Sequence, residues 1–148
     1  MSTLKHFLAY AADFEKTLVD DDWTRITPYF SDDAVYRVES DLFGCELHGP
    51  AAICQGIKKS LDGFDRKFPG REIAVTSGPD IKGDELRIAW TATYQKDALS
   101  PFVLRGESFA RLSGNKIALL VDSYDERVTP EAQAWMRETG IELDPSYV

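Results

Sequence analysis

The spacing of the apolar residues changes partway along the chain, and this change limits the possible folds more than any other feature. Before Gly70, apolar residues recur at helical spacing on two stripes, Leu4, Phe7, Leu8, Ala11, Phe14, Leu18 and Ile53, Ile57, Leu61, Phe64. From Arg71 onward they alternate with a period of two, as in half-buried strands. Helices followed by an antiparallel meander predict an α+β fold.

Turn and capping residues divide this pattern into elements. We expect helices from Leu4 to Val19, from Trp23 to Phe30 and from Pro50 to the break at Pro69-Gly70. The expected strands are Ala34–Glu39, Arg71–Ser77, Glu85–Gln95, Pro101–Leu112 and Lys116–Asp125, and a last helical turn runs from Thr129 to Gly140. At 148 residues we expect one domain, 1–148, with a core of about 4–127 and a helical turn and tail at 129–148.

The charge balance excludes some classes of partner. Lys and Arg number 17 against 25 Asp and Glu, for a formal net charge of −8, so nucleic acid and anionic membranes are not expected partners. The start of the chain lacks the layout of a signal peptide, and Cys45 and Cys54 favour two free thiols over a redox pair, so we expect a cytoplasmic protein.

The turn at Ser113–Lys116 predicts how the last two strands pair, because Gly and Asn tolerate the positive φ of a tight hairpin. A loop centred on Gly114-Asn115 pairs Phe109 with Leu120 and Glu107 with Asp122. Paired residues of an antiparallel ladder project to the same face, so the two carboxylates are expected side by side. A slip of one residue would put them on opposite faces.

The preceding strand extends this face. If Gln95 pairs with Phe102, Trp90 lies opposite Glu107, and the carboxylate face carries Ile88, Trp90, Ala92, Tyr94, Glu107, Phe109, Leu120, Asp122 and Tyr124. We expect the helices to cover this face and to enclose a space lined by aromatic rings. The opposite face is also apolar, so it is a candidate interface for a homodimer.

Two carboxylates in an aromatic pocket are costly to ionise together, so the pair would share a proton. This predicts Asp122 as a base, Glu107 as a neutral acid, and Tyr94 or Tyr36 as a hydrogen-bond donor to a developing oxyanion. The alternative is a structural network in which Arg105 and Arg111 pair with both carboxylates.

Other residues are candidates for ligand contact. Trp90 and Phe109 would stack on a ligand, and the further candidates are Tyr10, Phe14, His48 and Tyr124. His48 is either a proton shuttle or a surface residue. The segment Phe64–Arg71 is read as a helix exit with Asp65 paired to Arg66 or Arg71, in preference to an anion clamp. With two histidines and no close ligand cluster, no metal or other cofactor is expected.

The order of these motifs resembles the nuclear transport factor 2-like superfamily, in its SnoaL-like branch. The resemblance covers about 4–127 and rests on Trp23–Tyr36, His48–Ile53, Gly114–Ile117 and Asp122–Asp125. It implies three N-terminal helices packed on a curved, mostly antiparallel sheet that forms a cone with an apolar cavity. Many members of the superfamily dimerise through the outer face of the sheet.

The catalytic sets of the superfamily match this chain in part. In ketosteroid isomerases the general base, a tyrosine of the first helix and an acid of the oxyanion hole are catalytic. These positions fall on Val38, on Phe14 and near Glu107 in this chain, and only Glu107 has the matching residue type. Two positions of limonene epoxide hydrolases fall near Trp90 and Ala92, and only their last-strand acid matches, at Asp122, which also resembles the acid of SnoaL-like cyclases. We therefore expect a pocket for a small, apolar, cyclic ligand with cofactor-free isomerase, dehydratase or cyclase chemistry. The alternatives are a binding module without catalysis and a structural dimer whose cavity is filled by side chains.

Overall fold

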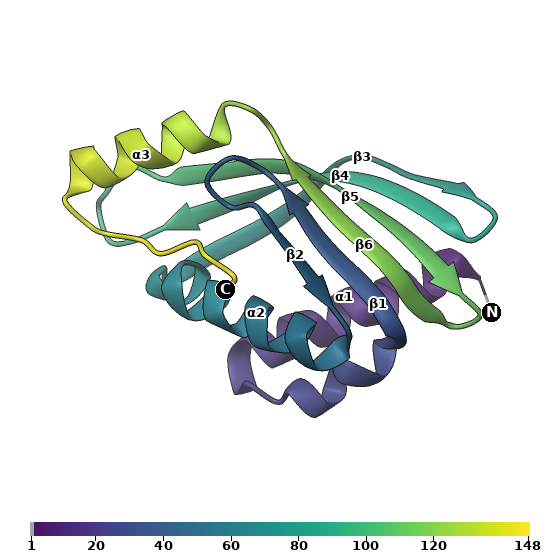
Figure 1. Cartoon of the computed structure of the whole chain (residues 1–148). Coiled ribbons are helices and arrows are strands. Elements are labelled where there is room, and N and C mark those ends of the chain that lie inside the picture. The colour runs from purple at the N-terminus through teal and green to yellow at the C-terminus, as the bar shows by residue number, and fades with distance from the viewer. Residues whose placement is uncertain (1) are drawn as a thin grey trace.

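A curved six-stranded sheet wraps around the helices of the first half of the chain, as Figure 1 shows for this computed structural model, which describes residues 2–148. The helices are α1 (Thr3–Asp20), α2 (Pro50–Gly63) and α3 (Val128–Thr139), with short 3-10 turns at Trp23–Arg25, Thr27–Tyr29 and Asp65–Lys67. The strands are β1 (Phe30–Glu39), β2 (Cys45–His48), β3 (Gly70–Lys82), β4 (Glu85–Gln95), β5 (Phe102–Ser113) and β6 (Lys116–Tyr124). The α+β class expected from the apolar spacing is therefore confirmed.

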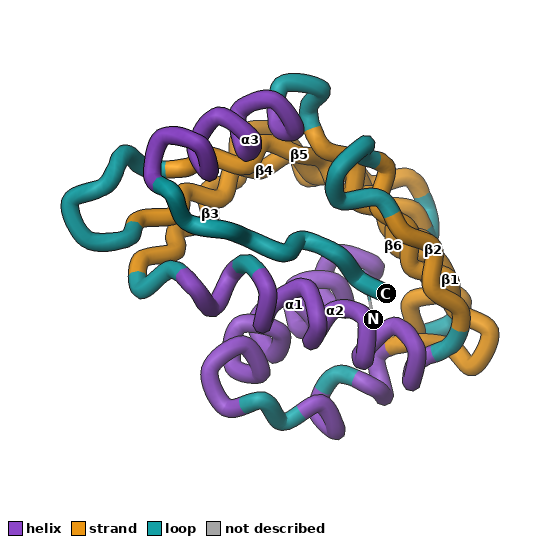
Figure 2. The backbone as a smooth tube through the Cα atoms, turned by 60° about the vertical axis from the view of Figure 1, so that its left-hand side comes forward, coloured by secondary structure: helices purple, strands orange, loops and turns teal. Residues whose placement is uncertain are grey.

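The sheet is mixed, with strand order β2-β1-β6-β5-β4-β3. The meander from β3 to β6 is antiparallel, whereas β1 runs parallel to β6. Helices α1 and α2 lie inside the curve of the sheet, and α3 follows β6 at the opposite rim (Figure 2). Across residues 2–148 we find no helix with the length and apolar content that a membrane crossing requires.

Local chemistry explains where the helices begin and end. The Ser2 side chain accepts a hydrogen bond from the Lys5 backbone N–H at 3.1 Å, and α1 ends at Asp21 in the left-handed conformation. Pro50 occupies the first turn of α2, where its missing N–H is not needed. Gly140 ends α3 in the left-handed conformation, as the sequence predicted.

Other expectations about the elements were wrong. The expected helix over Trp23–Phe30 is a pair of 3-10 turns, and β1 begins at Phe30, ahead of the expected start at Ala34. The segment Cys45–His48, which is not among the expected strands, forms β2 by pairing with β1. Both segments take their structure from partners distant in sequence, which local patterns do not report.

The expected pairing of Glu107 with Asp122 was also wrong, because β6 contains a bulge. The turn pairs Ser113 with Lys116 as predicted, but the register shifts by one residue between Arg111 and Leu112. Beyond this shift, Ser108 pairs with Asp122 and Glu107 pairs with Ser123. Since side chains alternate between faces, the extra residue moves Glu107 to the face opposite Asp122.

The pairing of β4 with β5 also differs from the expected register by one residue, although this ladder contains no bulge. Tyr94 pairs with Phe102, and Trp90 pairs with Gly106 in place of Glu107. The concave face of the sheet, toward α1 and α2, therefore carries Tyr36, Ile88, Trp90, Ala92, Tyr94, Leu104, Ser108, Leu120, Asp122 and Tyr124. The convex face carries Glu107 and Phe109.

Candidate functional site

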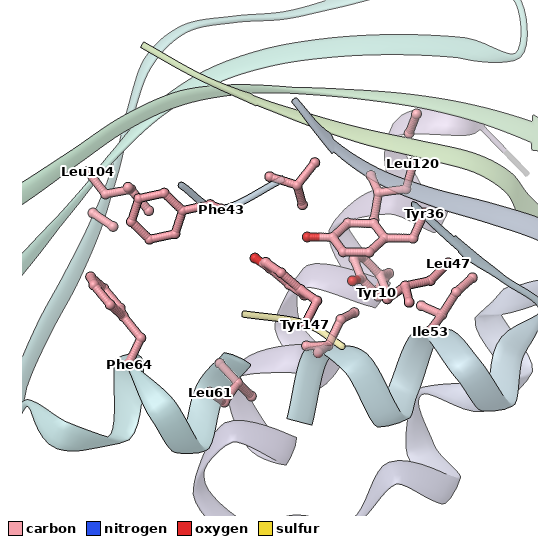
Figure 3. Packing of buried hydrophobic residues seen from close by; sticks show 14 of the residues in the cluster. Tyr10, Tyr36, Phe43, Leu47, Ile53, Leu61, Phe64, Leu104, Leu120 and Tyr147 are labelled. Atoms are coloured by element: carbon pink, nitrogen blue, oxygen red, sulfur yellow. The ribbon is translucent and has the colours of Figure 1, made fainter. Parts of the chain in front are cut away.

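A cavity of about 290 Å³ lies between the concave face of the sheet and helices α1 and α2. This volume is at the lower end of the range of roughly 300–1,000 Å³ typical of small-molecule sites. Aromatic rings form much of the wall, namely Phe7, Tyr10, Phe14, Tyr36, Phe43, Phe64, Trp90, Tyr94, Tyr124 and Tyr147. Figure 3 shows several of these side chains pointing into the space between the sheet and α2.

Asp122 is the centre of the first polar cluster in this cavity. Its Oδ1 accepts a hydrogen bond from the Ser108 hydroxyl at 2.6 Å, and its Oδ2 accepts one from the Tyr36 hydroxyl at 2.8 Å. The Ser108 oxygen in turn accepts a hydrogen bond from the Trp90 indole N–H at 2.9 Å. These neutral donors orient the carboxyl group, and neither Arg105 nor Arg111 pairs with it, so the alternative of an arginine network around Asp122 is wrong.

Burial raises the pKa of Asp122 above its usual value, and the hydrogen bonds from Ser108 and Tyr36 lower it by a smaller amount. Burial, reinforced by the nearby Asp122 charge, also raises the pKa of Tyr36 well above its usual value. A carboxyl group with a raised pKa exchanges protons nearer neutral pH than an exposed aspartate. Asp122 is therefore able to act as a general base in this cavity.

A second polar cluster lies where the chain leaves α2. The Asp65 Oδ2 accepts hydrogen bonds from the Tyr94 hydroxyl at 2.8 Å and from the Arg71 Nε at 3.2 Å. Arg71 also donates to both carboxylate oxygens of Glu15 on α1, at 3.0 and 2.7 Å. Burial raises the pKa of Asp65, and the Arg71 charge opposes this shift. The expected pairing of Asp65 with an arginine of this segment is confirmed.

The cavity opens to solvent between α1 and β3. Leu8, Ile73 and Val75 line the cavity and are 50%, 43% and 57% exposed. These apolar side chains at the edge of a cavity form a mouth through which an apolar molecule can enter.

The structure brings most of the candidate residues to this cavity. Tyr10, Phe14, Tyr36, Trp90, Tyr94, Asp122 and Tyr124 all line it. Three candidates lie elsewhere. Glu107 is exposed on the convex face and pairs with Arg87 at 3.0 Å. Phe109 lies on the same face, and the Arg87 guanidinium carbon is 4.7 Å from the centroid of its ring. His48 is exposed beside Glu46, at 3.2 Å.

Sequence reasoning missed six polar residues of the cavity wall: Glu15, Ser60, Asp65, Arg71, Ser108 and Tyr147. Ser108 was absent from the expected carboxylate face because of the register error. Arg71 and Asp65 were recognised as a pair, but nothing in their spacing indicated a cavity. Tyr147 lies in a tail without a periodic pattern, so no sequence signal assigned it a partner.

In residues 2–148, no group of three or more His, Cys, Asp or Glu side chains is placed to hold a metal ion. The wall contains three carboxylates and one arginine among mostly apolar groups, Glu15, Asp65, Asp122 and Arg71. This arrangement suits a small molecule with few polar atoms better than a phosphate-bearing cofactor, for which basic groups are needed.

Comparison with known proteins gives structural relatives only. No family model matches the chain, and no curated protein matches it. An NTF2-like protein of unknown function from Exiguobacterium sp. 255-15 shares 22% identity over 84% of this chain and 98% of its own, with a TM-score of 0.59.

Two further solved structures show the same architecture. A hypothetical protein with a ketosteroid isomerase-like fold from Catenulispora acidiphila DSM 44928, in complex with trimethylamine, is 19% identical over 84% of this chain and 88% of its own, with a TM-score of 0.61. An LEH-like epoxide hydrolase of M. tuberculosis is 15% identical over 92% of this chain and 93% of its own, with a TM-score of 0.60. At these identities the likeness is one of fold. The sheet, the enclosed helices and these relatives together establish that the chain has the NTF2-like cone fold.

Proposed function

We propose that the protein binds a small, mostly apolar, cyclic molecule in the cone cavity and moves a proton on it without a cofactor, as an isomerase, dehydratase or cyclase. Asp122 acts as the base. The observation that carries this proposal is a carboxyl group on the inner face of the sheet, held by two neutral hydroxyls, that faces an aromatic cavity.

The surroundings of Asp122 support this role. An ionised carboxylate without a nearby cation in an apolar site is destabilised, and this strengthens it as a base toward a bound C–H or O–H group. Trp90, Tyr10 and Phe14 supply flat apolar surfaces for a ring. The epoxide hydrolase among the structural relatives is consistent with the same fold enclosing a reacting small molecule.

Proton exchange on a cyclic ketone tests the proposal without knowledge of the natural substrate. We expect wild-type protein to accelerate exchange of the α-protons of 2-tetralone in D2O, as measured by NMR, because Asp122 removes a proton that solvent returns as a deuteron. Asp122→Asn removes the base and should lower this rate by about 100-fold or more. Asp80→Asn, a matched change on exposed β3 away from the cavity, should leave it unchanged.

The pH profile gives a second readout. The base is active only when ionised, so the wild-type exchange rate should rise with pH through the raised pKa of Asp122 and then level off. An exchange rate that does not differ between wild type and Asp122→Asn would contradict the catalytic role.

One observation favours a second candidate function, a binding module for a small amine. No cation pairs with Asp122 among residues 2–148, and the aromatic wall around it suits a cationic group. The trimethylamine in the Catenulispora relative is consistent with this alternative. Calorimetric binding of tetramethylammonium that is lost in Asp122→Asn, together with no exchange of 2-tetralone, would favour the module over the enzyme.

We also propose that two copies of the chain associate through the convex face of the sheet. Val103, Phe109 and Leu119 are partly exposed on this face beside Arg87, Arg105 and Glu107, and apolar side chains with charged neighbours are suited to an interface. Sedimentation equilibrium should give twice the chain mass for wild type and a single chain mass for Leu119→Lys. A single chain mass for wild type at micromolar concentration would contradict the dimer.

A further inference from the structure

The last eight residues, 141–148, form a segment without helix or strand that we call the C-terminal strap. Figure 2 shows this strap crossing from the end of α3 to α2. Near its end, Tyr147 is only 7% exposed and lines the cavity. A residue from the end of the chain thus becomes part of the cavity wall.

The strap packs closely against two glycines of helix α2. A Cβ atom at Gly63 would lie 2.1 Å from the Asp144 carbonyl oxygen, and one at Gly56, two turns earlier, would lie 3.0 Å from the Tyr147 carbonyl oxygen. The Asp144 N–H donates to the Gly63 carbonyl oxygen at 3.1 Å. The strap backbone therefore lies directly on α2 at positions where only glycine leaves room.

Two lysine side chains donate hydrogen bonds to the strap. The Lys59 Nζ donates to the Ser146 hydroxyl and to the Val148 carbonyl oxygen, the latter at 2.8 Å. The Lys67 Nζ donates to the Glu142 carbonyl oxygen at 3.2 Å. By contrast, the neighbouring Lys58 forms its ion pairs with Asp21 and Asp62, which lie outside the strap.

Inside the cavity, the Tyr147 hydroxyl lies 3.2 Å from the Tyr124 hydroxyl, and its ring centroid lies 5.9 Å from that of Tyr36. Figure 3 shows the hydroxyl ends of Tyr147 and Tyr36 pointing into the same space. Burial raises the pKa of Tyr147 to about 12, and hydrogen bonds from Tyr124 and Ser60 limit the rise. Tyr147 is therefore a neutral hydroxyl that can donate.

Three of the other hydroxyl groups in the cavity already donate to a carboxylate, whereas the Tyr10 hydroxyl, which also lines the cavity, is a competing donor that the test below includes. Tyr36 and Ser108 donate to Asp122, and Tyr94 donates to Asp65. When two hydroxyls share one hydrogen bond, the proton of the accepting group remains free. The Tyr124–Tyr147 pair thus keeps one O–H for a ligand, and the bond within the pair polarises it.

We propose that the Tyr124–Tyr147 pair, completed by the C-terminal strap, donates the hydrogen bond that holds a ligand carbonyl or hydroxyl oxygen opposite Asp122. The inference rests on the proposed function, since it requires a ligand in the cavity. It assigns the donor role to residues other than Tyr94 and Tyr36, and it specifies a ligand that carries a neutral oxygen acceptor.

The test compares two ligands that differ at one group. 2-Tetralone carries C=O where 2-methylenetetralin carries C=CH2, and the affinity of each is measured by displacement of the fluorescent probe N-phenyl-1-naphthylamine. We expect wild type to prefer the ketone. Tyr147→Phe should reduce this preference by about three- to tenfold while binding of 2-methylenetetralin changes less than about twofold.

Two further variants test the strap itself. Gly63→Ala displaces the strap backbone without changing a cavity residue, so it should reduce the ketone preference as Tyr147→Phe does. Lys59→Met should act in the same direction, and the matched Lys58→Met should have no effect. Circular dichroism and thermal unfolding check that each variant is folded.

The outcomes separate this inference from the proposed function. An unchanged ketone preference in both Tyr147→Phe and Gly63→Ala would overturn the donor pair while leaving the cavity proposal intact. Tyr10 also lines the cavity, so Tyr10→Phe is measured beside these variants. Loss of the ketone preference in Tyr10→Phe alone would overturn the assignment of the donor to Tyr124 and Tyr147 and would identify Tyr10 as the donor. Failure of wild type to bind either ligand or the probe would overturn both proposals.

Discussion

Replacing Arg71 with methionine is expected to lower the free energy of unfolding by about 3–5 kcal/mol, the usual cost of removing one partner of a buried ion pair. The side chains of Arg71 and Asp65 are only 15% and 13% exposed. Without the guanidinium, Asp65 keeps the Tyr94 hydroxyl but loses its counter-charge in a buried site. Glu15 also loses its bidentate partner, so the contact of α1 with β3 weakens.

Urea unfolding measures this loss, and its pH dependence has a defined sign. Burial raises the pKa of Asp65 in the folded protein, and removing Arg71 raises it further. A carboxyl group with a raised folded-state pKa loses stability as pH rises above its unfolded value near 4, because the unfolded chain ionises first. The variant should therefore be closer to wild type at pH 4 than at pH 8.

The matched control is Arg87→Met, which removes an exposed ion pair from the same sheet. Arg87 and Glu107 are 61% and 48% exposed. Exposed pairs contribute little, so the expected loss is below about 1 kcal/mol. Equal losses for Arg71→Met and Arg87→Met would mean that burial of the Asp65 cluster does not govern its energy.

Replacing Phe64 with alanine is expected to lower the free energy of unfolding by about 3–5 kcal/mol, as is typical when a buried aromatic side chain is deleted. Phe64 is 3% exposed. Its ring centroid lies 5.1 to 5.7 Å from those of Phe43, Phe68, Tyr94 and Phe102. No single neighbour can fill the space, because each ring is held by the others.

The deletion has a second effect, since Phe64 lines the cavity. The vacated volume joins the existing space, so N-phenyl-1-naphthylamine should bind Phe64→Ala at least as tightly as wild type, despite the loss of stability. Phe109→Ala is the matched control on the convex face, where the ring is half-buried, and it should cost about 1 kcal/mol with no effect on probe binding. Weaker probe binding in Phe64→Ala would indicate that its cavity collapses.

Features that depend on local spacing were predictable from the sequence. The bounds of β4 match the expected Glu85–Gln95, and the α2 residues Ile53, Ile57 and Leu61 are all buried as their helical stripe predicts. The turn at Gly114-Asn115 also forms where expected, with Gly114 at a φ of 62°. Each of these follows from backbone conformations and periodicities within a few residues.

The candidate site was predictable only in part. Asp122, Trp90 and Tyr94 reach the cavity because they share one side of the meander. Glu107 and Phe109 were assigned to the same side by a register that one bulge overturned. A bulge adds a single residue and changes neither composition nor turn, so the pattern of apolar residues does not reveal it.

The sequence by itself determined the α+β class, the order of the elements and the presence of an aromatic side of the sheet, since these follow from apolar periodicity. The tertiary structure alone decided which carboxyl groups face the cavity and what surrounds them. It brought Ser108 and Tyr36 to Asp122, Arg71 and Tyr94 to Asp65, and Tyr147 to Tyr124. These contacts join residues far apart in sequence, and they depend on strand register and on the path of an aperiodic tail, neither of which local spacing encodes.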